Sequence, residues 1–127
     1  MLSRDLTATV VKTFFEELDD VRDGGRRDEE YSPYVPLYTR YLKKEREWFL
    51  QVGVEDITVF FADDPIYKLE MLAELMYHDA RSVADREIQA AMFRKIMALY
   101  DVIDIRSMEF SVGRMKRADE MKKWLDE

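Results

Sequence analysis

The chain of 127 residues is acidic: 27 Asp and Glu oppose 20 Lys and Arg, which gives a net charge of −7. Its length predicts one domain, with a core large enough to be stable without cross-links. The lack of cysteine excludes disulfide and thiolate chemistry. No apolar run approaches the roughly 20 residues of a membrane span, and the amino terminus lacks a signal-peptide core. We therefore expect a single cytoplasmic domain spanning residues 1–127, without membrane contact.

Apolar side chains recur at helical spacing along residues 4–21, which predicts a first helix with one face in the core. These side chains are Leu6, Val10, Phe14, Leu18 and Val21. Ser3 is placed to cap this helix. A charged segment centred on two glycines follows, and we expect a mobile loop at residues 22–30. Two prolines then predict an extended strap over the core at residues 31–36.

Residues 37–52 predict another helix, which Gly53 would end in the left-handed conformation. Basic and aromatic side chains alternate here, a mixture typical of some nucleic-acid surfaces. The net charge of −7 would repel phosphate, so we favour an ordinary amphipathic helix and expect no nucleic-acid partner. Residues 54–62 have the composition of a strand but no partner strand. A short helix beginning near Glu55 or Asp56 is favoured instead.

The segment from Asp64 to Ile103 predicts two long antiparallel helices with a break near residues 82–85. Asp64 and Pro65 have the character of a helix start. Apolar residues recur at steps of three and four through both halves, among them Leu69, Leu72, Met76, Ile88, Met92, Ile96, Leu99 and Ile103. We therefore predict an all-α fold: one compact bundle of five or six helices around this hairpin, at about residues 64–103.

The last part of the chain predicts a connection and a final helix. Residues 104–110 are predicted to be irregular, with Ile105, Met108 and Phe110 lying against the core. Ser111 is the expected cap of the final helix. Its inward face is predicted to hold Met115, Ala118, Met121 and Leu125.

No catalytic or metal-binding constellation is visible in the sequence. The one histidine, His78, follows Glu74 by one helical turn. This spacing favours a hydrated or paired surface histidine over a metal site, because a chain without cysteine leaves only carboxylates as further ligands. The serines fall at expected caps and loops, and Gly24-Gly25 does not lie between a strand and a helix as a phosphate loop would. We expect no enzyme activity, no cofactor and no metal.

The first helix of the predicted hairpin carries a resemblance. A large residue, a leucine, a small residue and a second large residue recur here at spacings that resemble a tetratricopeptide-type hairpin. They are Leu69, Leu72, Ala73 and Met76. Ala91 and Ala98 are similar to the small residues of its second helix. The resemblance covers the hairpin alone, and the chain holds no second copy. It implies tetratricopeptide-like packing and the binding of peptides or partner proteins.

These observations predict a non-enzymatic protein-interaction or self-association module, with a protein partner or a second copy of the chain. The residues expected to bind the partner are Tyr31, Tyr34, Tyr38, Tyr41, Arg40 and Lys44. The alternative is a helical domain that binds a small apolar or aromatic ligand in a pocket lined by methionine and aromatic residues, of which the chain has eight Met, seven Tyr, seven Phe and two Trp.

Overall fold

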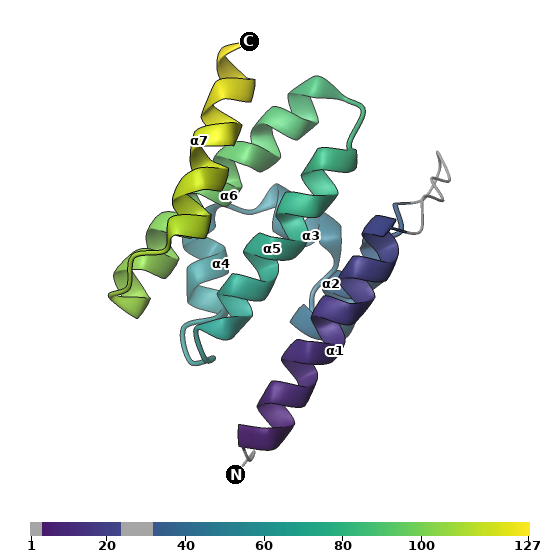
Figure 1. Cartoon of the computed structure of the whole chain (residues 1–127), viewed down its shortest axis with the longest axis vertical. Coiled ribbons are helices and arrows are strands. Elements are labelled where there is room, and N and C mark those ends of the chain that lie inside the picture. The colour runs from purple at the N-terminus through teal and green to yellow at the C-terminus, as the bar shows by residue number, and fades with distance from the viewer. Residues whose placement is uncertain (1–3, 24–31) are drawn as a thin grey trace.

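Seven α-helices make up the described part of the chain. The structure is a computed structural model that describes residues 4–23 and 32–127. In chain order the helices are α1 (Arg4–Asp23), α2 (Val35–Leu42), α3 (Arg46–Gln51), α4 (Val54–Phe60), α5 (Tyr67–Ser82), α6 (Arg86–Ser107) and α7 (Val112–Asp126) (Figure 1). The described residues contain no β-strand, which confirms the predicted all-α fold. The count exceeds the expected five or six because the helix predicted at residues 37–52 is two helices.

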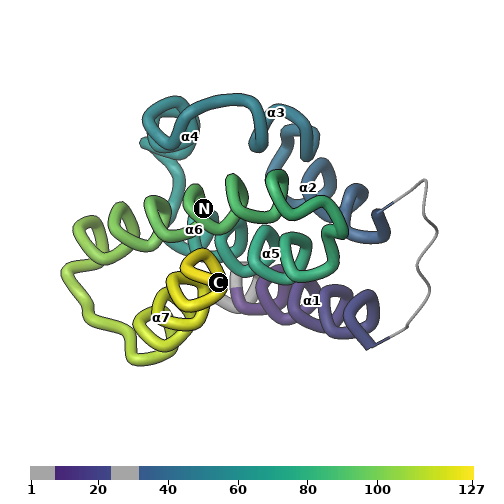
Figure 2. Tube along the Cα trace, turned by 90° about the horizontal axis from the view of Figure 1, so that it is seen from above, coloured from purple at the N-terminus to yellow at the C-terminus, as the bar shows by residue number. Residues whose placement is uncertain are grey.

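The α5–α6 hairpin lies at the centre of the fold, as predicted. Figure 2 shows α5 and α6 in a middle layer, with α2, α3 and α4 on one side and α1 and α7 on the other. Among the described helices, α5 and α6 share the most extensive contact. The side chains that this arrangement buries completely include Leu69, Leu72, Leu75, Met76, Ile96, Leu99 and Ile103. Their removal from water is the main force that holds the layers together.

The break between the two central helices is set by a capping residue. α5 ends at Ser82, and Asp85 precedes α6 in an extended conformation. One carboxylate oxygen of Asp85 accepts hydrogen bonds from the amides of Glu87, at 2.9 Å, and Ile88, at 3.1 Å. These amides have no partner inside the helix, so the side chain fixes the point where α6 begins.

The predicted start of α5 at Asp64 is wrong. The helix begins at Tyr67, and Ile66 is its N-cap without any side-chain hydrogen bond. The amide of Lys68 donates to the carbonyl of Pro65 at 3.1 Å. A tight backbone turn therefore satisfies this amide in place of a side-chain cap.

The helix predicted across residues 37–52 is interrupted after Leu42. Lys43 has a left-handed backbone, with φ of 66°, and its amide donates to the carbonyl of Thr39 at 3.2 Å. The chain is then extended at Glu45 before α3 begins. The apolar pattern alone did not reveal this because buried side chains continue on both sides of the interruption, from Leu42 to Phe49.

Lys95 of α6 anchors the end of α3. Its ammonium group donates to the carbonyls of Phe49, Leu50 and Val52 at 2.9, 2.8 and 2.7 Å. Such carbonyls at a helix end have no partner inside the helix. Gly53 was expected to be left-handed, but its φ is −75°, and it leads directly into α4 as that helix's N-cap. The short helix predicted at this point is confirmed.

The predicted strap at residues 31–36 is shorter than expected. α2 already begins at Val35, because proline is tolerated in the first turn of a helix. A turn precedes it, in which the Val35 amide donates to the carbonyl of Ser32 at 3.1 Å. The predicted mobile loop at 22–30 overlaps α1 by two residues, since α1 runs to Asp23. The rest of that loop, Tyr31 and the expected cap Ser3 lie outside the described residues.

The prediction for residues 104–110 is wrong in two ways. α6 continues to Ser107, where Met108 ends it in a left-handed conformation, and the apolar side chains point outward. Ile105, Met108 and Phe110 are 77%, 91% and 74% exposed. The reason is length: α6 has 22 residues and α5 has 16, so α6 is longer by about 9 Å, at about 1.5 Å per residue. Its last turn has no long helix beneath it.

Candidate functional site

Two pockets of about 290 Å³ each lie beside α7. The first, which we call the Tyr100 pocket, lies between α1, α5, α6 and the start of α7. Phe15, Ala73 and Ile103 form its apolar wall. Its polar lining includes Glu74, Tyr100, Ser111, Gly113, Arg114 and Arg117. Four helices therefore bring together side chains that are far apart in the sequence.

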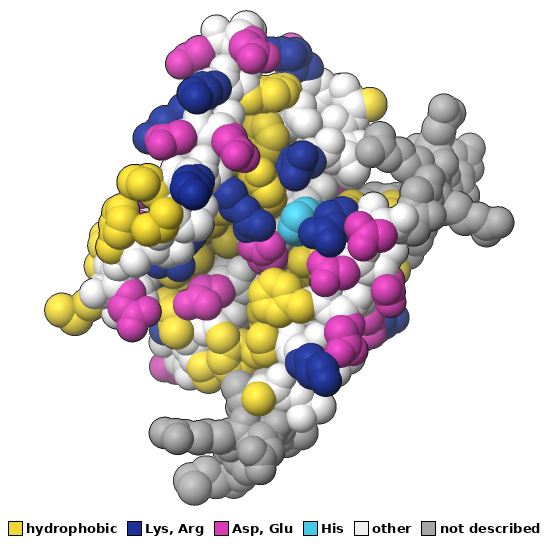
Figure 3. All heavy atoms as spheres, viewed as in Figure 1, with side chains coloured by type: hydrophobic (Ala, Val, Ile, Leu, Met, Phe, Trp, Pro, Cys, Tyr) yellow, Lys and Arg dark blue, Asp and Glu magenta, His cyan; other side chains and the backbone are white. Residues whose placement is uncertain are grey.

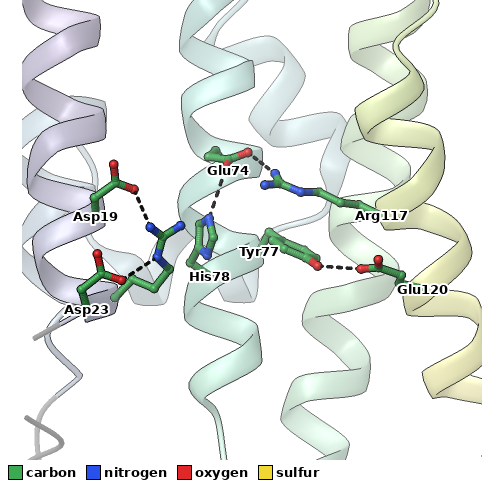
Figure 4. A network of polar contacts seen from close by, with 8 residues as sticks. Asp19, Asp23, Glu74, Tyr77, His78, Arg117 and Glu120 are labelled. Atoms are coloured by element: carbon green, nitrogen blue, oxygen red, sulfur yellow. Dashed lines mark hydrogen bonds and ion pairs between the residues drawn. The ribbon is translucent and has the colours of Figure 1, made fainter. Parts of the chain in front are cut away.

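A carboxylate on α5 links an imidazole and a guanidinium at the edge of this pocket (Figure 4). One oxygen of Glu74 lies 3.1 Å from Nε2 of His78, and the other is bonded to the guanidinium of Arg117 on α7. Burial raises the pKa of Glu74, but the hydrogen bonds from His78 and Arg117 outweigh it and lower the pKa to about 2. His78 is paired, as predicted, but it is buried and does not lie on the surface.

Glu74→Gln is expected to make the fold less sensitive to acid. The carboxyl has an ordinary pKa of 4.5 when unfolded and about 2 when folded. Because the folded value is lower, the stabilisation is fully present above about pH 4.5 and is lost as the pH falls towards 2. It amounts to on the order of 3 kcal/mol.

Urea unfolding at pH 7 and pH 3 measures this effect. The wild-type protein should lose more unfolding free energy between the two values than Glu74→Gln does. Glu47→Gln, on an exposed part of α3, is the matched control and should lose as much as the wild type. An equal loss in wild type and Glu74→Gln would contradict the assignment.

The second pocket, the Trp124 pocket, is lined by aromatic residues of α5, α6 and α7. Its wall includes Tyr77, Phe93, Met121 and Trp124. Two rings already carry a cation: Arg86 lies 4.3 Å from the centre of the Trp124 ring, and Arg117 lies 4.4 Å from that of Tyr77. The Tyr77 hydroxyl donates to Glu120 at 3.1 Å (Figure 4). The expected ligand pocket lined by methionine and aromatic residues stays a prediction, and this pocket is the place where such residues meet.

A fully buried carboxylate lies under α2 and α3. Asp79 has no exposed surface and accepts from Nε and Nη2 of Arg46 at 2.7 and 3.2 Å. It also accepts from the Tyr38 hydroxyl at 2.6 Å. Burial and the adjacent Asp79 hold the pKa of Tyr38 well above its ordinary value, so this phenol stays a hydrogen-bond donor. The cluster ties α2, α3 and α5 together.

An exposed apolar surface lies where α6 meets α7, and we call it the apolar corner. It consists of five exposed large side chains within eleven consecutive residues: Ile105, Met108, Phe110, Val112 and Met115. Figure 3 shows apolar atoms gathered on this edge of the molecule. Met115 was predicted to face inward, and its exposure corrects that prediction. The backbone is well fixed here, because the Ser111 hydroxyl accepts from the amide of Arg114 at 3.2 Å and caps α7 as predicted.

The residues predicted to bind a partner lie mainly in the core. Tyr34, Tyr38 and Tyr41 are buried, and Tyr31 is outside the described residues. Arg40 is exposed and paired with Glu17 of α1. Lys44 lies over the rings of Trp48 and Phe60, at 5.1 and 5.5 Å from their centres. The structure therefore does not bring the five described residues of this set together into one exposed surface, and the partner role of all six stays a prediction.

Sequence reasoning missed the Tyr100 pocket and the apolar corner. Glu74 and Arg117 are 43 residues apart, and only the packing of α7 beside α5 brings them together. No local pattern encodes that contact. The corner had a weak signal: apolar residues recur at short intervals from Ile103 to Phe110.

Within residues 4–23 and 32–127, no three Asp, Glu or His side chains lie in a group able to hold a metal ion. No helix in the same ranges is both long and apolar enough to cross a membrane. The resemblance to a tetratricopeptide-type hairpin stays a prediction. Comparison of the chain with protein-family models, with curated proteins and with solved structures found no match.

Proposed function

We propose that this protein is an interaction module that docks an apolar segment of another protein on the apolar corner. The observation that carries the proposal is the exposure of Ile105, Met108 and Phe110 on a fixed helix–turn–helix backbone. Large contiguous apolar patches are rare on monomers, and they mark interaction sites when a polar rim surrounds them. Two of the five side chains are methionines, which adapt their shape to different apolar partners.

The rim of the corner favours a partner with basic residues beside its apolar anchor. Asp63, Asp101 and Glu109 are exposed and make no ion pair within the described residues. Asp101 is one helical turn before Ile105, so both lie on the same face of α6. The net charge of −7 adds long-range attraction for a basic partner and repulsion between two copies of the chain.

The basic residues around the corner are largely engaged already. Arg114 donates to the carboxylate of Asp104 at 2.8 Å and to the carbonyl of Glu109 at 3.2 Å. Arg106 donates to the carbonyl of Asp64 at 3.1 Å. Within residues 101–116, Lys116 is the basic side chain left without an ion pair or hydrogen bond. A partner therefore meets an apolar centre and a rim whose available charges are mostly negative.

Phe110→Asp is expected to abolish this docking. Peptides selected by display on the full-length protein should carry large apolar residues flanked by Lys or Arg. Fluorescence anisotropy should show at least a tenfold loss of affinity for them in Phe110→Asp. A fall in affinity would distinguish apolar docking from purely electrostatic binding, because the added negative charge would strengthen electrostatic binding of a basic peptide. Burial of one large apolar side chain is worth about 1.5–3 kcal/mol, which is more than a factor of ten.

Ile88→Asp is the matched control for this experiment. Ile88 is also an exposed apolar residue of α6, but it lies about 25 Å from Ile105 along the helix, at about 1.5 Å per residue. It should leave peptide binding unchanged. Two results would contradict the proposal: equal loss in both variants, or a concentration-dependent dimer in sedimentation that Phe110→Asp dissociates, which would assign the corner to self-association.

A further inference from the structure

Within residues 4–23 and 32–127, the exposed methionines lie in the apolar corner. Met108, which ends α6, is 91% exposed, and Met115, in the first turn of α7, is 43% exposed. The other methionines of these ranges are buried or half-buried: Met71, Met76, Met92, Met97 and Met121. The chain has no cysteine, so no thiol competes for an oxidant. A reagent that oxidises sulfur therefore reaches the described part of the folded protein first at the corner.

The two exposed methionines belong to the docking surface and not to the core. Met108 lies between Ile105 and Phe110 in the chain, and all three are exposed. Met115 is three residues after Val112, so both lie on the same face of α7. The amides of both methionines donate to carbonyls four residues earlier, at 3.0 and 3.1 Å, which fixes the backbone. A change at either sulfur therefore alters the docking surface while the helices that carry it stay in place.

Oxidation of a thioether gives a side chain that is poorly suited to an apolar contact. The sulfur attacks one oxygen of hydrogen peroxide, and an S–O bond forms as the O–O bond breaks. The sulfur is oxidised by two electrons, and the departing oxygen takes the proton of the transferred one and leaves as water. The product, methionine sulfoxide, is polar and chiral, whereas methionine is apolar and flexible. Docking of an apolar segment then requires the sulfoxide oxygen to lose its water, which is unfavourable.

We propose that Met108 and Met115 are a reversible oxidation site, which switches the corner from a docking surface to one that binds its partner weakly. The oxidant is a small peroxide, of which hydrogen peroxide is the simplest. Methionine sulfoxide reductases, one for each sulfoxide epimer, return both residues to methionine. The switch rests on the docking function proposed above, whereas the choice of oxidised residues depends on exposure alone. Burial of Met71 and Met76 keeps the core out of the reaction.

Brief treatment of the full-length protein with hydrogen peroxide, followed by mass spectrometry, locates the oxidised residues. Trypsin leaves Met108 as the one methionine of residues 107–114, and cleavage after glutamate leaves Met115 as the one methionine of residues 110–120. Both are expected to oxidise about ten times faster than Met71 and Met76, which share the tryptic peptide of residues 69–81. Equal rates at the corner and in the core would overturn the assignment of the oxidation site.

Peptide binding measures the switch. Peroxide is removed, and the peptides selected by display are added to the oxidised and the untreated protein. Oxidation is expected to weaken binding about tenfold in fluorescence anisotropy, since it removes the apolar contacts of the two methionines. Treatment with both reductases should restore the affinity. Far-UV circular dichroism should show unchanged helix content, because the oxidised side chains lie outside the core.

The double variant Met108→Leu/Met115→Leu is the matched control, since leucine keeps the apolar volume and has no sulfur. It should bind the peptides as the untreated wild type does, both before and after peroxide. Three results would overturn the switch: equal affinity of the wild type before and after oxidation, an equal loss of affinity in the double variant, or a loss of helix. If the untreated wild type bound no selected peptide, the docking function would be refuted and the switch with it, while the map of oxidised residues would stand.

Discussion

Asp79→Ala is expected to lower the free energy of unfolding by about 3–5 kcal/mol, because it leaves the partly buried guanidinium of Arg46 and the fully buried hydroxyl of Tyr38 without their acceptor. Asp79 is fully buried and holds both the guanidinium of Arg46 and the hydroxyl of Tyr38. Without the carboxylate, water could replace only part of the bonds lost by the Arg46 guanidinium, which is 20% exposed, and none of the bond lost by the buried Tyr38 hydroxyl. Loss of the cluster would also remove the side-chain hydrogen bonds that join α2 and α3 to α5.

Urea unfolding at pH 7 measures this loss as a lower midpoint with an unchanged slope. Asp101→Ala, which removes an exposed carboxylate from α6, is the matched control and should change stability by less than about 0.5 kcal/mol. Adding Arg46→Met to Asp79→Ala should restore part of the loss, since the unpaired charge is then gone. If the double variant lost as much unfolding free energy as the two single variants lose together, Arg46 and Asp79 would not act as a pair.

The central hairpin could be predicted from the sequence because its signals are local. Apolar residues at steps of three and four define a helix face, and Asp85 follows the break at the position where a cap is expected. Ile105 and Phe110, in a segment predicted to be irregular, were assigned to the core from their apolar character alone, and this assignment is wrong. Periodicity shows which residues share a face, but not whether another helix is long enough to cover that face.

The candidate sites were beyond local reasoning for a different reason. The pairing of Glu74 with His78 is one helical turn and was visible in the sequence, whereas the contact of Glu74 with Arg117 depends on how α7 packs. The place of a tyrosine also cannot be predicted from local sequence, since its ring is suited to a core and its hydroxyl to a surface. Tyr38 was assigned to a partner surface, but Asp79, 41 residues later, supplies the buried acceptor that lets its hydroxyl enter the core.

Leu72→Ala and Ile96→Ala are each expected to destabilise the protein by about 2–5 kcal/mol, as buried large-to-small substitutions do. Both side chains are fully buried, one on each helix of the central hairpin. Each substitution removes apolar contacts and leaves a cavity between layers that are held from both sides, so neighbouring helices cannot collapse to fill it. Ile88→Ala, at an exposed site on α6, is the control and should cost less than about 0.5 kcal/mol. The measurement is urea unfolding with a common slope for all three variants. If either core variant lost less than about 0.5 kcal/mol, the hairpin would not hold the buried face described here, because a filled core site cannot lose that volume at so small a cost.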